Sequence, residues 1–408
     1  MLRRAFTLLA AACALAACVA QDPVASNRPG AILPPAGPPG ERVGNRVAIL
    51  LPLTGPNAEV GQAMLRAAQL NFRDPGSPPL DPRDTGGTPA GAAAAARAAI
   101  EGGAGLLLGP LTTQETGAVA PVARAAAVPV LAFTSDSAQS QPGVWALGIS
   151  PAQQVRRLVQ AVQAEGRTRF AAVVPDDPFG NALADGLLTG AGQPVPRIER
   201  YAGGFPNLNA ALKRVADYAN RRGAAEARER AARPDGDAPR EAPAPSREPV
   251  PPPPFDALLL GAVGDQLGQA APLLAAYDIG PEQVRILGPA LWARQAGRLG
   301  ALSGAWYAAP DPAGRAGFEQ LYAAAHGGPP RELASIAFDA AGVARAAWDG
   351  RGFPVAALLR PEGYVGADGL LGLQPDGSVR RGLAIFEIDR GGAHIVQPAP
   401  QSLAAPGV

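Results

Sequence analysis

Short apolar runs alternate with amphipathic helical patterns along most of this chain, and this alternation restricts the fold more than any other feature. The first run, Arg46–Leu51 (RVAILL), is almost wholly apolar, as expected for a strand that is covered on both faces. A helical pattern follows, with apolar residues on one face at Val60, Met64, Ala67, Ala68 and Phe72. Strands that alternate with helices favour a parallel sheet with right-handed crossovers and helices on both faces.

The alternation runs twice along the chain. Further strands are predicted at residues 105–108, 128–133, 170–174, 255–260, 284–287 and 304–308. Helices are predicted at residues 89–101, 113–127, 179–188, 265–277, 312–325 and 333–349, and two more begin near Pro151 and Asn207. Residues 363–396 are β-rich, with a turn at Pro375-Asp376-Gly377. Two rounds predict an α/β fold of two doubly wound parallel-sheet lobes with an interlobe cleft.

The composition excludes several classes of function. The net charge is +1, so no broad positive field favours nucleic acid. Cys13 and Cys18 both lie near the N-terminus, so neither a disulfide nor a thiolate metal site is expected in the folded body. His326 and His394 are far apart in the sequence, and neither lies in a ligand motif. We therefore expect no metal and no cofactor.

The sequence also lacks the motifs of common enzymes. It contains neither a G-x-S-x-G elbow nor a phosphate-binding loop with its lysine. Asp176 and Asp177 could act as paired carboxylates in acid–base catalysis. They directly precede a predicted helix, however, where carboxylates cap backbone amides and suit the helix dipole. We therefore predict a protein without catalytic residues.

The N-terminus is typical of a secreted and lipid-anchored protein. A basic pair, a short apolar run and small residues precede Cys18, a pattern typical of a secretory signal over residues 1–17. The apolar run is too short to span a bilayer. Leu15-Ala16-Ala17-Cys18 resembles a bacterial lipobox, which implies lipidation of Cys18; a plain secretory signal with an incidental cysteine is the alternative. Val19 after the cysteine resembles an outer-membrane address, with the inner membrane as the alternative.

Two segments have compositions unsuited to a packed core. Residues 18–44 are polar and rich in proline, and we expect them to form a lipid-attached tether. Residues 222–254 begin with a stretch of charged residues and alanines and continue with many prolines. We therefore predict a disordered insertion there. The insertion is either a surface loop that has expanded or a functional arm.

Four short motifs resemble those of type I periplasmic binding proteins. They are the stretch at residues 46–62 (RVAILLPLTGPNAEVGQ), residues 107–112 (LLGPLT), residues 128–135 (VPVLAFTS) and residues 175–180 (PDDPFG). The resemblance covers residues 45–396. It implies lobe 1 at residues 45–148 plus 311–360, lobe 2 at residues 149–309 plus 361–397, and a tail at residues 398–408. The chain would cross between the lobes near Ile149, Pro310 and Pro361.

Within this fold the chain resembles the penicillin-binding protein activators. The resemblance rests on residues 109–111 (GPL), 304–307 (GAWY) and 369–381 (GLLGLQPDGSVRR), together with the insertion before residue 255. It implies a non-catalytic lipoprotein on the periplasmic face of the outer membrane. Its expected partner is a bifunctional penicillin-binding protein, a peptidoglycan synthase that it binds and stimulates. The best-known members carry a helical-repeat domain before this fold, which the sequence given does not show.

The alternative is a solute-binding lipoprotein of an ABC transporter for branched-chain amino acids or related solutes. A small-molecule ligand would then lie in the cleft, at hydroxyls and amides that follow strands. The resemblance gives as cleft candidates Thr54, Thr112, Thr113, Thr134, Ser135 and Phe179. Neither an aromatic residue near Glu59 and Val60 nor an acidic residue at 288–291 is present to hold an amino acid. The hydroxyls could instead cap helices and bond within loops.

Overall fold

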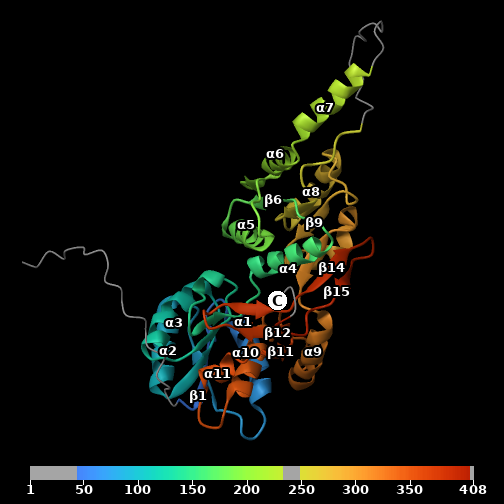
Figure 1. Cartoon of the computed structure of the whole chain (residues 1–408). Coiled ribbons are helices and arrows are strands. Elements are labelled where there is room, and N and C mark those ends of the chain that lie inside the picture. Colours follow the sequence, from blue (N-terminus) through green and yellow to red (C-terminus); the bar gives the residue numbers. More distant parts are fainter. Residues whose placement is uncertain (1–43, 233–248, 405–408) are drawn as a thin grey trace, which may run out of the picture. The chain divides into compact units, whose positions relative to one another are not determined.

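The computed structural model describes residues 44–232 and 249–404. The predicted signal at 1–17, Cys18 and almost all of the predicted tether lie outside these residues. Most of the predicted strands and helices are confirmed, with small differences in their bounds. They form two mainly parallel sheets and one small antiparallel sheet (Figure 1).

The first sheet has the strand order β2-β1-β3-β4-β5, and all of its strands are parallel. Its strands are β1 (Arg46–Leu51), β2 (Leu80–Asp84), β3 (Ala104–Leu108), β4 (Val130–Ala132) and β5 (Val144–Ala146). Alternate residues of β1 face opposite sides. Val47 and Ile49 pack in one core with α1 (Ala58–Gln69) and α10 (Ala334–Ala347). Ala48 packs in another with α2 (Pro89–Glu101) and α3 (Thr113–Ala125).

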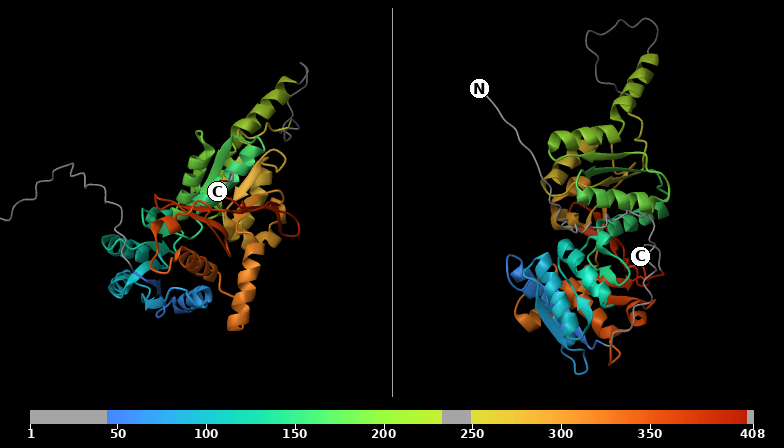
Figure 2. Two further views of the ribbon diagram at one scale, coloured as in Figure 1. Left: turned by 60° about the horizontal axis from the view of Figure 1, so that its bottom comes forward. Right: turned by 90° about the vertical axis from the view of Figure 1, so that its left-hand side faces the viewer.

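The second sheet has the strand order β15-β14-β10-β9-β8-β6-β7. Its parallel strands are β6 (Phe170–Pro175), β7 (Ile198–Tyr201), β8 (Ala257–Leu260), β9 (Arg285–Gly288) and β10 (Trp306–Ala309). The strands β14 (Ala384–Ile388) and β15 (Ala393–Gln397) are antiparallel. Helices α4 (Pro151–Ala164) and α5 (Pro178–Ala191) cover one face, and α6 (Phe205–Val215) and α8 (Asp265–Ala276) cover the other (Figure 2).

The third sheet corrects the predicted extent of lobe 2. It consists of β11 (Tyr364–Gly366), β12 (Gly369–Leu373) and β13 (Val379–Arg381), all antiparallel. Its apolar side chains, including Leu371 and Val379, pack in the same core as β1 and α10. Residues 364–381 therefore pack with the first sheet, whereas the prediction placed residues 361–397 in lobe 2. The chain reaches the second sheet only after β13, at residues 382–383, and not near Pro361.

We call the first and third sheets with their helices lobe 1, and the second sheet with its helices lobe 2. Helix α9 (Pro312–His326) follows β10 and packs with α1 and α10, so it belongs to lobe 1. In this division the chain passes from lobe 1 to lobe 2 between β5 and α4, and it returns to lobe 1 between β10 and α9. The remaining short elements are α11 (Val355–Leu358), η1 (Leu70–Phe72), η2 (Ser137–Gln139), η3 (Ala290–Arg298) and η4 (Gly300–Leu302).

The predicted insertion at 222–254 is wrong in its first part. Helix α7 (Tyr218–Ala231) covers ten residues that were expected to be disordered. Arg221 anchors the base of this helix, because its Nη1 donates to the carbonyls of Ala216 and Tyr277, each at 3.1 Å. Residues 233–248, which hold several of the prolines, lie outside the described residues.

Candidate functional site

Lobe 1 carries a pocket of about 620 Å³ where its strands end. We call it the lobe 1 pocket. Loops after β3, β4 and β5 line one side of it, and residues near α9, α10 and β12 line the other. This is the edge at which parallel α/β sheets place ligands. The pocket brings together four of the predicted site residues, namely Thr112, Thr113, Thr134 and Ser135.

Thr112 is the N-cap of α3. Its Oγ1 accepts a hydrogen bond from the amide of Glu115 at 3.3 Å, and the Glu115 carboxylate accepts from the Thr112 amide at 3.1 Å. This reciprocal pair is a capping box. The same carboxylate is fully buried and also accepts from the Oγ1 atoms of Thr112 at 2.9 Å and Thr85 at 2.6 Å. The Thr112 hydroxyl therefore serves the helix terminus.

Thr113 and Thr134 are bonded to each other. Their Oγ1 atoms lie 3.0 Å apart, and Thr134 Oγ1 also accepts from the amide of Asp136 at 3.1 Å. Thr134 is nearly buried. Ser135 is exposed, and its hydroxyl forms no hydrogen bond with the described residues. Of the four hydroxyls, that of Ser135 is thus the one without a hydrogen bond to the described residues.

The same pocket contains a charged cluster that the sequence did not predict. Arg315 on α9 forms an ion pair with Asp368, with Nε 3.2 Å from Oδ1. Ser335 donates to Asp368 Oδ2 at 2.8 Å, and Asp368 is only 2% exposed. These residues are 20 to 53 positions apart in the sequence, so no local motif connects them. The cluster satisfies its own charges, as a buried ion pair must.

A second buried carboxylate, Asp339 of α10, lies beside this cluster. It accepts hydrogen bonds from the amides of Ala367 at 2.6 Å and Asp368 at 3.2 Å. Burial, together with the charge of Asp368, raises the pKa of Asp339 to about 7, although Arg381 opposes the shift. Asp339 therefore changes its charge near neutral pH.

Two predicted cleft residues lie outside the lobe 1 pocket. Thr54 donates from Oγ1 to Asp84 Oδ2 at 2.6 Å, so its hydroxyl orders the loop that follows β1. Asp84 Oδ1 also accepts from the amides of Leu53 and Gly86, each at 2.8 Å. Phe179 lies in lobe 2 and lines a separate pocket there.

That pocket, which we call the lobe 2 pocket, has a volume of about 480 Å³. Three carboxylates line it, from Asp176, Asp177 and Asp265. Asp177 caps α5 as predicted, because its Oδ1 accepts from the amide of Gly180 at 2.7 Å. Asp176 and Asp265 are exposed. The carboxylates give this pocket a negative character.

Tyr201 also lines the lobe 2 pocket. Its hydroxyl donates to Gln266 Oε1 at 2.9 Å. Burial, with the charge of Asp177 added, raises the pKa of Tyr201 to about 12. The phenol therefore stays neutral and can both donate and accept hydrogen bonds.

The buried side chain of Trp292 leaves no room for an acidic side chain at Gly288. The indole ring of Trp292 fills the space beside Gly288, where an added Cβ would lie 2.2 Å from it. Trp292 is fully buried, and its Nε1 donates to the carbonyl of Ala262 at 2.9 Å. Carboxylates at the ends of β6 and β8 instead supply negative charge to lobe 2.

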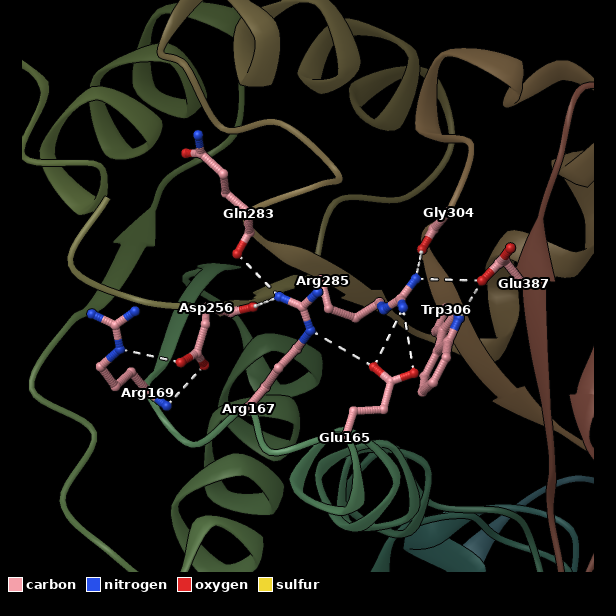
Figure 3. A network of polar contacts seen from close by, with 9 residues as sticks. All are labelled: Glu165, Arg167, Arg169, Asp256, Gln283, Arg285, Gly304, Trp306 and Glu387. Carbon is pink, nitrogen blue, oxygen red and sulfur yellow. Dashed lines mark hydrogen bonds and ion pairs between the residues drawn. The ribbon is translucent and has the colours of Figure 1, made fainter. Parts of the chain in front are cut away.

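A separate polar network lies at the N-terminal ends of β9 and β10 in the second sheet (Figure 3). Arg285 Nη1 donates to the carbonyl of Gly304 at 2.8 Å and lies 3.3 Å from Glu387, while Nη2 lies 3.3 Å from Glu165. The guanidinium also stacks on Trp306, 4.3 Å from the ring centroid. Because two carboxylates surround this cation, we interpret the network as structural support for the strand ends.

The described residues contain no group of three or more His, Cys, Asp or Glu side chains arranged to hold a metal ion. Within the same residues, no helix is long and apolar enough to cross a membrane. Neither finding concerns the N-terminal 43 residues.

A family model described as "Periplasmic binding protein" matches residues 45–228. The chain has the type I periplasmic binding protein fold. No curated protein matches the chain in sequence. Several solved structures share the fold at identities below 20%, and two kinds of protein occur among them.

One similar structure is a putative branched-chain amino acid ABC transporter from Rhodospirillum rubrum. It is 19% identical, with a TM-score of 0.65, and the match covers 86% of this chain and 99% of that chain. Another is full-length LpoA from Haemophilus influenzae, 16% identical with a TM-score of 0.64, covering 88% of this chain and 60% of that one. A third is the LpoA C-domain from Haemophilus influenzae, described as a regulator of PBP1A. It is 16% identical, with a TM-score of 0.60, and the match covers 86% of this chain and 99% of that chain. At these identities the likeness establishes the fold.

Proposed function

We propose that this chain is a non-catalytic envelope lipoprotein that binds and stimulates a bifunctional peptidoglycan synthase. Its fold is that of binding proteins. The observation that carries the proposal is that hydroxyls of the lobe 1 pocket already form hydrogen bonds within the chain. Thr112 is committed to capping α3, and Thr113 and Thr134 bond to each other. A small solute that bound the atoms already used in these bonds would have to break them, which costs the desolvation of each group that loses its partner.

The mechanism follows from linkage between binding and conformation. A protein that binds the active state of the synthase more tightly than the inactive state shifts the enzyme toward activity. The coupling needs no chemistry in this chain. Lipidation at Cys18 would hold the protein at the periplasmic face of the outer membrane, and residues 18–44 would connect the anchor to the folded body. The inner membrane is the alternative address.

Addition of the purified chain to a bifunctional penicillin-binding protein from the same bacterium is expected to raise its rate of peptidoglycan synthesis. Glycan polymerisation and peptide cross-linking are measured separately with lipid-linked precursor as substrate. A coupling of about 1 kcal/mol gives roughly a fivefold increase in rate. The heat-unfolded chain is the control. Unchanged rates at saturating concentrations, with no complex detected by sedimentation, would contradict the proposal.

One observation favours the second candidate, a solute-binding lipoprotein of an ABC transporter. The lobe 2 pocket offers three carboxylates and a neutral tyrosine hydroxyl, which suit a solute that carries a cationic group. In that case, titration calorimetry with a panel of amino acids and amines should give tight, stoichiometric binding. Asp265→Asn should weaken this binding by about tenfold, the effect of losing about 1.4 kcal/mol. Such a result, without synthase stimulation, would reverse the ranking of the two functions.

A further inference from the structure

Four charged side chains of lobe 1 follow one another in a row of contacts. Arg315 Nε on α9 lies 3.2 Å from Asp368 Oδ1 in the turn between β11 and β12. The amide of Asp368 donates to Asp339 Oδ2 on α10 at 3.2 Å, and Arg381 Nη1 on β13 lies 3.6 Å from the same oxygen. We call these four residues the charged row. The row joins four separate elements of lobe 1.

The charged row reaches each segment through which the chain crosses between the lobes. These segments are residues 147–150, 310–311 and 382–383, and we call them the hinge. Arg315 lies in the first turn of α9, just after the second segment, and Arg381 ends β13, just before the third. Nη2 of Arg381 also donates to the carbonyl of Leu147, in the first segment, at 2.5 Å. A change of charge in the row is therefore placed to act on the hinge.

The two carboxylates of the row are bonded unequally. Asp368 accepts hydrogen bonds from Nε and Nη2 of Arg315 and from the Ser335 hydroxyl. Among the described residues, Asp339 accepts only from two backbone amides. Asp368 is 2% exposed and Asp339 is 4% exposed, so two adjacent negative charges are costly there. Of the two carboxylates, Asp339 is thus the one that a proton stabilises.

Arg381 has two competing acceptors. Its side chain is 0% exposed, and within residues 44–232 and 249–404 its Nε and Nη1 have no hydrogen-bond partner. Nη2 holds the carbonyl of Leu147. The Asp339 carboxylate at 3.6 Å is too distant for a hydrogen bond but near enough to attract the cation when it is ionised. The guanidinium can therefore gain a bond by moving toward Asp339.

We propose that Asp339 is a proton-dependent switch on the hinge. With the proton bound, Arg381 holds the carbonyl of Leu147 and the first hinge segment is fixed to β13. Without the proton, the Asp339 carboxylate draws the guanidinium away from Leu147 and repels Asp368, so the hinge loosens. The inference does not depend on which partner or solute the chain binds.

Other charged groups around α10 are engaged elsewhere. Helix α1, which packs in the same core, carries Glu59 and Arg66. Glu59 pairs with Arg331, and Arg66 Nε donates to the hydroxyl of Tyr322 at 3.1 Å. The groups that act on the charge of Asp339 are therefore the other members of the charged row.

The switch operates near neutral pH. Burial, together with the charge of Asp368, raises the pKa of Asp339 to about 7, and the charge of Arg381 opposes this shift. The proton is bound more tightly in the folded protein than in the unfolded chain, so ionisation strains the folded state. The hinge is therefore firm below pH 7 and looser above it.

Two hydrogen bonds from lobe 2 limit how far the hinge loosens. Arg157 Nε on α4 donates to the carbonyl of Leu383 at 2.9 Å, and Gln153 Nε2 donates to the carbonyl of Val379 at 2.7 Å. These bonds end on backbone carbonyls, which do not titrate. Ionisation of Asp339 therefore increases motion at the hinge without separating the lobes.

The test follows the Leu147 carbonyl by nuclear magnetic resonance in the full-length chain, labelled with carbonyl ¹³C leucine and ¹⁵N glycine. The peptide group of Leu147 and Gly148 then gives a signal that reports on the bond from Arg381. Between pH 5.5 and pH 8 this signal is expected to shift with a midpoint near 7. The leucine–glycine pair at residues 260–261 in lobe 2 is the internal reference and should not follow this midpoint.

Relaxation dispersion of glycine amides measures the loosening itself. The amides of Gly148 and Gly382 donate to the carbonyls of Thr134 and Leu370, each at 3.0 Å, so both report on hinge segments. In the unchanged protein, exchange on the microsecond to millisecond timescale should appear at pH 8 and be absent at pH 5.5. Signal shifts that follow the prediction without any dispersion at pH 8 would overturn the loosening.

Three variants assign the effect to Asp339. Asp339→Asn should abolish both the shift and the dispersion, because asparagine mimics the protonated acid. Arg381→Met, a second variant that leaves Asp339 in place, should also remove the pH response. Asp376→Asn, at the turn of the same sheet, is the matched control, because the pKa of Asp376 is lowered and its charge is constant in this range. It should respond like the unchanged protein. A pH response that persists in Asp339→Asn and in Arg381→Met would overturn the switch.

Discussion

Replacing Trp145 by alanine is expected to lower the free energy of unfolding by about 3–5 kcal/mol. Trp145 on β5 is 1% exposed and packs in the core that joins the first sheet, α10 and the third sheet. Its Nε1 donates to the carbonyl of Gln374, at the turn between β12 and β13, at 2.8 Å. The substitution therefore leaves a large cavity and removes a bond that ties this hairpin to lobe 1. Chemical denaturation followed by circular dichroism measures the change.

Trp145→Phe is the matched control. It keeps an aromatic ring in the core but loses the indole donor, so the expected loss is smaller, about 1–3 kcal/mol. The comparison also tests where the third sheet packs. If Trp145→Ala cost less than about 1 kcal/mol, the packing of the β12–β13 hairpin against β5 would contribute little. The assignment of residues 364–381 to lobe 1 would then be contradicted.

The strands of the two parallel sheets could be predicted because both of their faces are covered. A strand such as β1 must be apolar at nearly every position, and RVAILL therefore stands out in the sequence. The helices that follow carry cap residues that are equally visible. Ser150 and Pro151 predict the start of α4, and the structure has a capping box there.

Edge strands were missed for the opposite reason. β2, with the sequence LDPRD, pairs on one side only and includes Pro82. An edge strand needs no continuous apolar run and tolerates proline, so its sequence resembles that of a loop. β7, with the sequence IERY, lies at the edge of the second sheet and escaped prediction in the same way.

The lobe assignment of the C-terminal segment depends on long-range packing. Local alternation predicts that residues 363–396 form strands but does not say which core they join. β13 and β14 are separated by two residues, yet β13 pairs with β12 in the third sheet and β14 with β10 in the second. Only the positions of Trp145 and α10 decide that the hairpin packs on lobe 1.

The candidate site, too, could be predicted from the sequence only in part. Thr112, Thr113, Thr134 and Ser135 could be predicted to gather, because each follows a strand of one parallel sheet. Their hydrogen-bond partners could not be predicted, and these partners decide which hydroxyl remains free. The Arg315–Asp368 ion pair joins residues 53 positions apart, and the hydrogen bond from Arg157 to the carbonyl of Leu383 joins residues 226 positions apart. Nothing in local sequence marks such pairs.

Asp339→Asn is expected to remove a pH-dependent loss of stability. Burial and the charge of Asp368 raise the pKa of Asp339 to about 7 in the folded chain, from an ordinary value of 3.8. The folded state therefore holds this proton more tightly than the unfolded state does. Its contribution to stability is full below pH 3.8 and is lost as the pH rises to 7. Between pH 5 and pH 8 the loss is about 3 kcal/mol, and asparagine, which cannot titrate, avoids it.

The measurement compares unfolding free energies of the two proteins at pH 5 and pH 8. Asparagine keeps an oxygen that accepts from the amide of Ala367, so it mimics the protonated acid. Carboxyls whose pKa is lowered, such as Asp349 and Asp376, titrate below this window and are common to both proteins. The unchanged protein should therefore lose stability relative to Asp339→Asn as the pH rises. If it gained stability instead, the ion pair between Asp339 and Arg381 would dominate, and the raised pKa of Asp339 would be contradicted.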